Sequence, residues 1–541
     1  MKGKWIALIV CVVVLAAAGV YAYQRVWDRV PDDVAISITP ENAGVFASLY
    51  VNPSNDQKRA IDSLLQRFPQ TESFDDTKNL LINLLDPELE PLGINFEDDI
   101  EPWLGDQIAG FVVPPSSGQI VPDAAALLAT DDEDATQEAI DKVLESQSET
   151  EVDLETRTHE GIEYRVDPDP AEDEPAAAYG FVESYLVVGT EGAVTAAIDA
   201  SQGSTLEDSD EYRATVEPFY EDRIALVYFD AGGFLEVLAA DPALDPRTSA
   251  QFESLREFDA LGPYAFAVRA ASDGAMIETS TRLAEEGAYS DITRAFEGQG
   301  LVRDLPGASW AALGLPQVGL LAELTIRSIE DSGGAADVAE VERAVRAETG
   351  LDLREDILSW MGNAGLFVQG TDLQSIGGGL VVESSDPAKS DAALDALVQL
   401  ANREQPGLLE PLERDGRSGY SVQVPGLPVP INVLGGESLI VAVGEKATDD
   451  LLSGDTSLGD SERFDDVDEL IGEDLNPIFF VDIEAALQLA DNFLPQGGVG
   501  GAEDDVIQQE VRPVLEHFTY AVVGVKVEGG TALQRFVVGI E

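Results

Sequence analysis

The sequence predicts an α+β protein made of two related lobes that follow an N-terminal membrane segment. Its 541 residues exceed what one hydrophobic core usually supports, so we expect more than one domain. Strand and helix patterns alternate without the uniform βαβ units of a parallel sheet, and one sequence pattern occurs twice. A parallel sheet covered by helices is the alternative fold.

The N-terminal residues predict membrane targeting. The stretch from Trp5 to Gln24 is uncharged and mostly apolar, and Arg25 ends it. About 20 such residues are enough for a helix to cross the hydrocarbon core of a bilayer. We therefore expect residues 1–33 to form a single-pass signal anchor of the cell membrane, with the C-terminal bulk outside the cytoplasm. Cleavage near Ala22, which would release a secreted protein, is the alternative.

The elements after this segment follow from hydrophobic periodicity. Residues 45–51 are rich in β-branched and aromatic side chains and predict a strand, and apolar residues at helical spacing predict a helix over 56–68. Similar patterns predict strands at 107–113, 124–128, 162–166, 177–182, 185–189, 377–382 and 439–443, and helices at 136–144, 194–200 and 391–400. We expect antiparallel or mixed sheets with helices on one face.

An internal repeat supports the two lobes. The pattern G-x-x-x-x-x-D-I-x-x-W-x-G occurs at 93–105 and again at 350–362. Three further matches follow in the same order at nearly the same spacing: 205–212 with 457–464, 227–230 with 479–482, and 264–268 with 520–524. Colinear matches of this kind indicate a tandem duplication. We expect copies at 34–285 and 302–541, joined by a linker at 286–301.

The charge of the chain excludes one class of partner. Asp and Glu total 102 against 32 Lys and Arg, which gives a formal net charge of −70. Such a chain repels the phosphates of nucleic acids, so we expect no nucleic-acid partner. An acidic surface also suits a salt-rich habitat, which is a hypothesis that the sequence leaves open.

Several segments resemble a known family. They are the opening strand Pro40–Val51, the end of the first helix at Arg67–Pro69, the strand-Asp-helix step at Leu127–Ile140, and the Leu-x-x-Ser-Asp step before Val227–Asp230. Together they resemble an uncharacterised bacterial family known as domain of unknown function 3352. The resemblance implies membrane-attached proteins outside the cytoplasm, and it implies no activity and no functional residues.

The residues needed for common catalytic sites are scarce. Cys11 is the only cysteine and lies in the membrane segment, so no downstream disulfide, thiolate metal site or cysteine nucleophile is expected. His159 and His517 are the only histidines, and neither accompanies a nucleophile motif such as G-x-S-x-G. We therefore predict no catalytic, cofactor-binding or metal-binding residues.

The repeated aspartates Asp99 and Asp356 are the sharpest candidates among the acidic residues. An acid/base or ion-binding role is one interpretation. We favour a structural one, in which Asp99 is the N-cap of a short helix that carries Ile100 and Trp103 on one face and stops at Gly105.

Two acidic runs and two glycine-rich stretches are further candidate ligand sites. Asp131–Asp134 and Asp167–Glu174 could collect Ca²⁺, but neither has EF-hand spacing, and we expect solvated loops. The stretches 377–379 and 496–501 lack the lysine of a phosphate-binding loop.

These observations predict a membrane-anchored, extracytoplasmic and non-enzymatic protein that acts as a binding or interaction module of the cell envelope. A carrier or chaperone for an apolar ligand such as a lipid is the alternative. A hydrolase that uses carboxylates alone is a third hypothesis.

Overall fold

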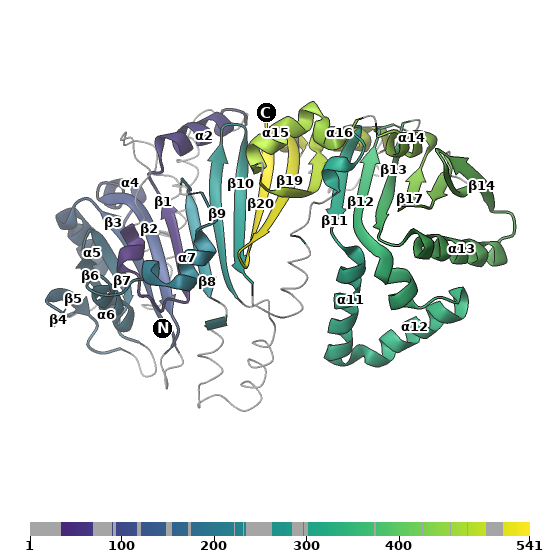
Figure 1. Ribbon diagram of the computed structural model, residues 1–541. Coiled ribbons are helices and arrows are strands. Elements are labelled where there is room, and N and C mark those ends of the chain that lie inside the picture. The colour runs from purple at the N-terminus through teal and green to yellow at the C-terminus, as the bar shows by residue number, and fades with distance from the viewer. Residues whose placement is uncertain are drawn as a thin grey trace. The chain divides into compact units, whose positions relative to one another are not determined.

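A computed structural model describes most of the chain (Figure 1). The described residues are 34–68, 89, 93–115, 121–147, 154–170, 175–220, 222–230, 232–233, 262–283, 296, 301–372, 375–424, 427, 429–454, 456–472, 474–493 and 512–541. The expected membrane segment at 1–33, most of the expected linker at 286–301 and the glycine-rich stretch 496–501 lie outside them. Among the described helices, none has the length and apolarity that crossing a membrane requires.

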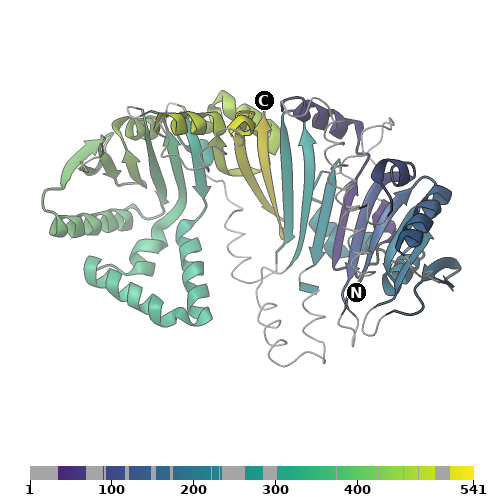
Figure 2. The same ribbon diagram turned by 180° about the vertical axis from the view of Figure 1, so that it is seen from behind.

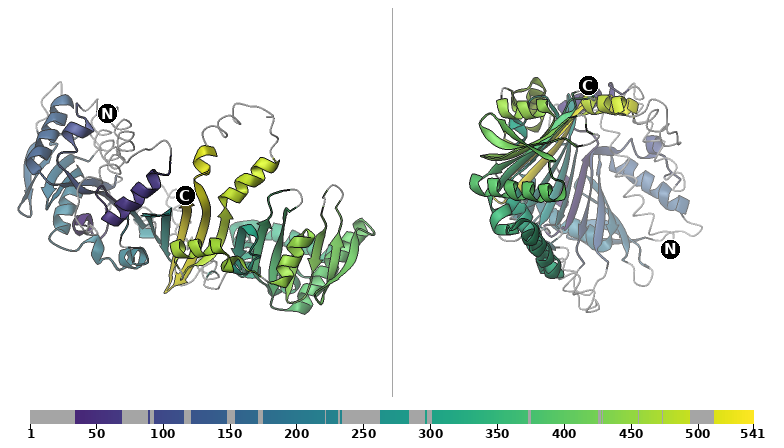
Figure 3. Two further views of the ribbon diagram at one scale, coloured as in Figure 1. Left: turned by 90° about the horizontal axis from the view of Figure 1, so that it is seen from above. Right: turned by 90° about the vertical axis from the view of Figure 1, so that its right-hand side faces the viewer.

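The chain divides into two compact units, Met1–Arg282 and Leu283–Glu541, which we call unit 1 and unit 2. Both combine helices with antiparallel strands, as the α+β prediction requires (Figure 3). Within each unit, all described strand pairings are antiparallel, so the alternative of a parallel sheet is wrong.

The described strands of unit 1 form one sheet of antiparallel neighbours. Their order in the sheet is β4 (Glu155–His159), β5 (Ile162–Val166), β6 (Ala177–Val182), β7 (Tyr185–Thr190), β3 (Asp123–Thr130), β2 (Leu104–Val113), β1 (Val45–Tyr50), β8 (Ala225–Asp230), β9 (Pro263–Ala271) and β10 (Gly274–Arg282).

The described strands of unit 2 are arranged in the same way. Their order is β14 (Leu409–Arg414), β15 (Arg417–Val422), β16 (Ile431–Leu434), β17 (Ser438–Val443), β13 (Gly377–Ser384), β12 (Met361–Gln369), β11 (Ser309–Leu315), β18 (Asn476–Asp482), β19 (Phe518–Glu528) and β20 (Thr531–Ile540). The two sheets therefore have the same strand order. Each unit 2 strand corresponds to the unit 1 strand whose number is ten lower, so that β11 corresponds to β1 and β20 to β10.

The helices connect these strands at matching points of the two units. In unit 1 they are η2 (Val34–Ile38), α2 (Asn55–Leu65), α4 (Phe96–Asp99), α5 (Glu133–Gln147), α6 (Glu191–Ala200), η4 (Leu206–Asp208) and α7 (Asp210–Val216). In unit 2 they are η6 (Val302–Asp304), α11 (Val318–Ile329), η7 (Glu330–Gly334), α12 (Ala335–Thr349), η8 (Leu353–Ile357), η9 (Leu358–Trp360), α13 (Pro387–Glu404), α14 (Glu445–Ser453), η10 (Leu458–Asp460), α15 (Glu462–Ile471), α16 (Ile483–Phe493) and α18 (Arg512–Leu515).

The strands and helices that periodicity predicts are found, with ends that differ by a few residues. The predicted strand at 162–166 is β5, and the predicted helix at 136–144 is the middle of α5. Strand β4 was not predicted, because its sequence Glu-Thr-Arg-Thr-His has no apolar alternation.

Helices cover both faces of the sheet in unit 1, so the prediction of one covered face is wrong. Directly opposed residues share a face, and Ala126, Gly110 and Ala47 form one such row. Helix α5 packs on that side, whereas α7 packs Tyr212 against Phe46 on the other (Figures 1 and 2). The reason is visible in β3, whose residues 125–128 are all buried and therefore need cover on both sides.

The same holds for unit 2, where α13 and α14 pack on opposite faces of β13. Val382 packs with Ala393 of α13, while its neighbour Val381 packs with Leu451 of α14. Successive residues of a strand point to opposite faces, so the two helices lie on different sides.

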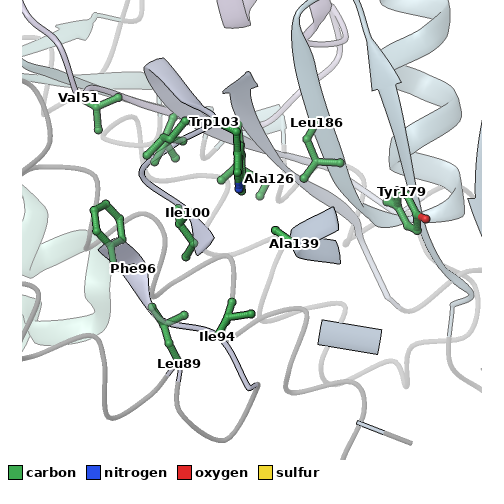
Figure 4. Close-up of a cluster of buried hydrophobic side chains, with 13 residues drawn as sticks. Val51, Leu89, Ile94, Phe96, Ile100, Trp103, Ala126, Ala139, Tyr179 and Leu186 are labelled. Atoms are coloured by element: carbon green, nitrogen blue, oxygen red, sulfur yellow. The ribbon is translucent and has the colours of Figure 1, made fainter. Parts of the chain in front are cut away.

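The best-defined core of unit 1 lies between α4, α5 and the sheet (Figure 4). Its buried members are Val51, Leu89, Ile94, Phe96, Ile100, Trp103, Leu104, Ile108, Ala126, Leu128, Ala139, Tyr179 and Leu186. Trp360 holds the corresponding place in unit 2, packed with Ala364, Val382 and Ala393. The repeated Trp pattern thus supplies a core residue to each unit.

Candidate functional site

The repeated aspartate Asp99 is not the N-cap of its helix. Asn95 caps α4, since its side chain accepts a hydrogen bond from the Asp98 N–H at 2.7 Å. Asp99 is the last residue of α4, and its Oδ2 accepts a bond from the Asn95 N–H at 2.9 Å. The cap prediction is wrong by one helical turn. The predicted stop at Gly105 is also wrong, because α4 ends at Asp99 and Gly105 lies in β2.

The contacts of Asp99 are nevertheless structural. Its two carboxylate oxygens lie 2.7 and 2.9 Å from Lys142 Nζ on α5, and its backbone oxygen accepts a bond from Trp103 Nε1 at 2.6 Å. In unit 2, Asp356 accepts from the Asp352 N–H at 2.9 Å, and its backbone oxygen accepts from Trp360 Nε1 at 3.1 Å. The pattern closes the same turn in both units.

The two histidines lie in separate settings. His159 is the last residue of β4, and its Nε2 is 2.6 Å from Asp199 Oδ1. A turn follows at Glu160 and Gly161, both with positive φ. His517 precedes β19, and its backbone oxygen accepts a bond from the Glu541 N–H at 2.9 Å.

The acidic and glycine-rich stretches mostly belong to regular structure. Asp132 accepts a bond from the Ala135 N–H at 3.0 Å at the start of α5. Residues 377–379 begin strand β13, and residues 171–174 of the second acidic run lie outside the described part of the chain. Within the described ranges, no three His, Asp or Glu side chains come together as a metal site would require.

A cleft of about 810 Å³ in unit 1 gathers acidic side chains that the sequence did not single out. It is formed by the loop before β1, the end of α6, the start of α7 and the end of β8. Its lining residues are Pro40, Glu41, Asn42, Ala43, Ala196, Asp199, Ala200, Ser204, Ser209, Glu211, Tyr228, Asp230 and Gly233. Four of these carry carboxylates and none carries a positive charge at neutral pH.

Local structure fixes two of the carboxylates. Asp230 ends β8, and its Oδ1 accepts a bond from the Gly233 N–H at 2.9 Å. Glu211 lies in the first turn of α7, whose N-cap Ser209 accepts a bond from the Tyr212 N–H at 3.3 Å. Acidic side chains are favoured in such a first turn.

Tyr228 is the buried polar residue of the cleft lining. Its side chain is only 2% exposed, and its ring meets that of Tyr212 edge-on at 5.1 Å between centroids. In the described part of the chain its hydroxyl has no hydrogen-bond partner. Burial, and then the charges of Asp230 and Glu211, raise the pKa of Tyr228, so the phenol stays neutral.

The corresponding place in unit 2 has a different chemistry. The matched segments put Arg463 where unit 1 has Glu211, and Phe480 where it has Tyr228. Arg463 Nη1 lies 2.8 Å from Asp482 Oδ2, the carboxylate that matches Asp230. A single ion pair therefore neutralises this position in unit 2.

Backbone contacts confirm that these positions are comparable. The single bridge between Pro40 and Thr205 in unit 1 matches that between Pro306 and Ser457 in unit 2. The rings of Phe464 and Phe480 are 5.4 Å apart, close to the 5.1 Å of the matching tyrosines. The signal in the sequence was the exchange of Glu for Arg and Tyr for Phe between otherwise similar segments.

The family model described as "Protein of unknown function (DUF3352)" matches residues 5–513. The chain belongs to the DUF3352 family. This confirms the resemblance found in the sequence. No curated protein matches this DUF3352 chain.

Two solved structures are similar to parts of it. Crystal form III of TP0453 is 13% identical with a TM-score of 0.21, covering 47% of this chain and 80% of that one. Crystal form I of TP0453 is 12% identical with a TM-score of 0.21, covering 48% and 82%.

Proposed function

We propose that this DUF3352 protein is a membrane-anchored, extracytoplasmic and non-enzymatic binding module of the cell envelope, built from two copies of one α+β unit. The acidic cleft of unit 1 is its binding site. The observation that carries the proposal is that one unit keeps an open acidic cleft where the matched position of the other holds an ion pair.

The tandem duplication is supported by topology as well as by sequence. The described strands follow the same order in both units, and both units have the bridge before the α7 or α15 helix. Gly93 and Gly350, which open the Trp pattern, both have positive φ, at 73° and 77°. Shared backbone detail of this kind favours two copies over chance similarity.

The lining of the cleft favours a polar ligand. Its side chains are mostly acidic, small or hydroxyl-bearing, and a lipid carrier would need a largely apolar cavity. We therefore place the binding of an envelope component ahead of lipid transport.

The first experiment places a photo-reactive amino acid at Asn42, an exposed residue of the cleft lining, in intact cells. Ala308, which is also exposed, is the matched position in unit 2 and serves as the control. We expect a discrete adduct at Asn42 and none at Ala308. Equal adducts at both positions, or none at either, would contradict the binding of an envelope partner at unit 1.

A second experiment tests the anchor. Residues 5–24 would hold the bulk at the outer side of the membrane, so added protease should digest it in spheroplasts while the protein sediments with membranes. N-terminal sequencing then distinguishes an intact anchor from cleavage near Ala22. A protease-resistant protein in intact spheroplasts would refute the proposed location.

A further inference from the structure

We propose that the acidic cleft of unit 1 binds an organic ammonium cation with several N–H donors. A free polyamine and the amine groups of a lysine-rich peptide share this chemistry. The inference rests on the proposed function and specifies the ligand of the same site.

The first argument is charge without compensation. Glu41, Asp199, Glu211 and Asp230 line one cleft, and no Lys or Arg is among the lining residues. Of these four, Asp199 is also hydrogen-bonded to His159, which is not itself a lining residue. Ammonium groups form strong charge-assisted hydrogen bonds with carboxylates, so they complement such a lining.

The second argument is the buried phenol, which is independent of the acidic residues. Tyr228 lines the cleft and is 98% removed from solvent, and its hydroxyl makes no hydrogen bond within the described residues. This oxygen is not among the fully buried polar atoms, so it is open to the cleft and a ligand can supply the hydrogen bond that the protein does not. The neutral hydroxyl can accept a bond from an N–H, and the ring face can attract a cation.

The third argument comes from unit 2. There the cation is built into the chain, because the Arg463 guanidinium lies against Asp482. The phenol is replaced by Phe480, which needs no hydrogen-bond partner. Unit 2 thus shows what satisfies this position: a positive N–H donor. In unit 1 that donor is absent from the lining and would come from the ligand.

The size of the cleft favours an extended cation over a single metal ion. Its volume of about 810 Å³ falls in the range of cavities that hold organic ligands, roughly 300–1,000 Å³. The four carboxylates come from four separate segments around that space, which suits a chain with several amine groups.

The test must separate this site from the general attraction of an acidic protein. With a net charge of −70, the chain attracts any polycation at low salt. Titration of the purified full chain in detergent with spermidine is therefore done at about 0.15 M salt, where the Debye length is about 8 Å.

Two variants copy unit 2 into unit 1. Glu211→Arg should weaken spermidine binding at least about tenfold, because it replaces attraction by repulsion and can pair with Asp230 as Arg463 pairs with Asp482. Tyr228→Phe should weaken binding about fivefold, through the loss of one hydrogen bond. The control Glu217→Arg makes the same charge change at an exposed residue outside the cleft lining and should alter binding less than about twofold.

Several outcomes overturn the inference. Equal weakening by Glu211→Arg and Glu217→Arg shows non-specific attraction only. Unchanged binding in Glu211→Arg, with the wild-type circular dichroism spectrum, removes the cleft as the site. Tighter binding of Ca²⁺ alone that depends on Glu211 shows a metal site in place of an amine site.

Two further comparisons distinguish a free polyamine from a lysine-bearing partner, and the ammonium inference from the binding-module proposal. Tighter binding of trilysine than of spermidine, again lost in Glu211→Arg, identifies a lysine-bearing partner, and the reverse order identifies a free polyamine. If the Asn42 adduct forms in cells but neither probe binds, the ammonium inference fails while the binding-module proposal stands. If spermidine binds but no adduct forms, only the proposed envelope partner is lost.

Discussion

Replacing Asp99 with Ala tests whether the repeated aspartate is a structural residue. The change removes the acceptor of the Asn95 N–H, at 2.9 Å, and the contacts with Lys142 at 2.7 and 2.9 Å. Leaving a partly buried N–H without a partner costs about 1–2 kcal/mol. The ion pair adds at most about 1 kcal/mol, because half of the lysine side chain is exposed. We expect a total of about 2 kcal/mol.

Two matched variants separate the hydrogen-bond part of this loss of stability from the ion-pair part. Asp356→Ala in unit 2 removes the equivalent N–H acceptor, but the nearby Lys389 bonds to the Glu355 backbone oxygen and to Ser359 instead. It should therefore cost about 1 kcal/mol, without the ion-pair part. Lys142→Met removes only the ion pair and should cost less than about 1 kcal/mol.

Amide hydrogen exchange is the suitable assay, because two units need not unfold in one step. A local loss of 2 kcal/mol predicts roughly 30-fold faster exchange for the amides of 95–104 in Asp99→Ala. Unchanged exchange there, together with lost ligand binding, would refute the structural interpretation and restore the functional one.

Three further predictions concern the core, an ion pair and pH. Phe46→Ala should destabilise unit 1 by about 3–5 kcal/mol, measured by hydrogen exchange of its sheet amides, since this ring is fully buried, whereas Phe266→Ala should cost less than about 1 kcal/mol because that ring is 45% exposed. Arg303→Met breaks two hydrogen bonds of 2.6 and 2.7 Å with a carboxylate of α15 and should destabilise unit 2 by about 1–3 kcal/mol. Arg327→Met, at an exposed helical pair, should cost less than about 0.5 kcal/mol, and equal effects of the two arginine variants in the same assay would contradict this. A hydrogen bond from the arginine just after α2 lowers the pKa of Asp273, so this contact stabilises the folded state above the unfolded pKa of about 3.9 and is lost as the pH falls through the lower folded value. Hydrogen exchange in α2 should therefore quicken, relative to its intrinsic rate, as acid is added, and Asp273→Asn should remove that dependence.

Periodicity predicted the elements well because most of them bury one face. Strands β5 and β6 and helix α5 have clear apolar patterns, and the sequence placed them within a few residues. Periodicity could not predict in the same way how many faces of each sheet are covered by helices. In β3 the run Ala-Ala-Leu-Leu is buried throughout, and a short apolar run does not say whether one helix layer or two will cover it.

The cap of α4 shows a different limit. Both Asn95 and Asp99 suit helix N-termini by residue type, and only the geometry of the turn decides between them. The side chain of Asp99 reaches back four residues to the Asn95 N–H, so it satisfies a free donor of the same helix end from inside the helix. Residue type therefore predicts that a helix begins in this region, but it does not decide whether Asn95 or Asp99 is the N-cap.

The cleft could not be predicted because its lining comes from residues 40 to 233, brought together only by the fold. Under the proposed duplication, however, the sequence holds a usable signal in the differences between copies. Positions that serve the core keep their type, as Trp103 and Trp360 do. Glu211 and Arg463 occupy matched positions and carry opposite charges. In unit 2 Arg463 pairs with the carboxylate of Asp482, whereas in unit 1 Glu211 adds a second carboxylate beside Asp230 in the cleft lining. A reversal of charge between two copies, at a place where the backbone is unchanged, is therefore a stronger indication of a binding site than any single acidic run in this chain.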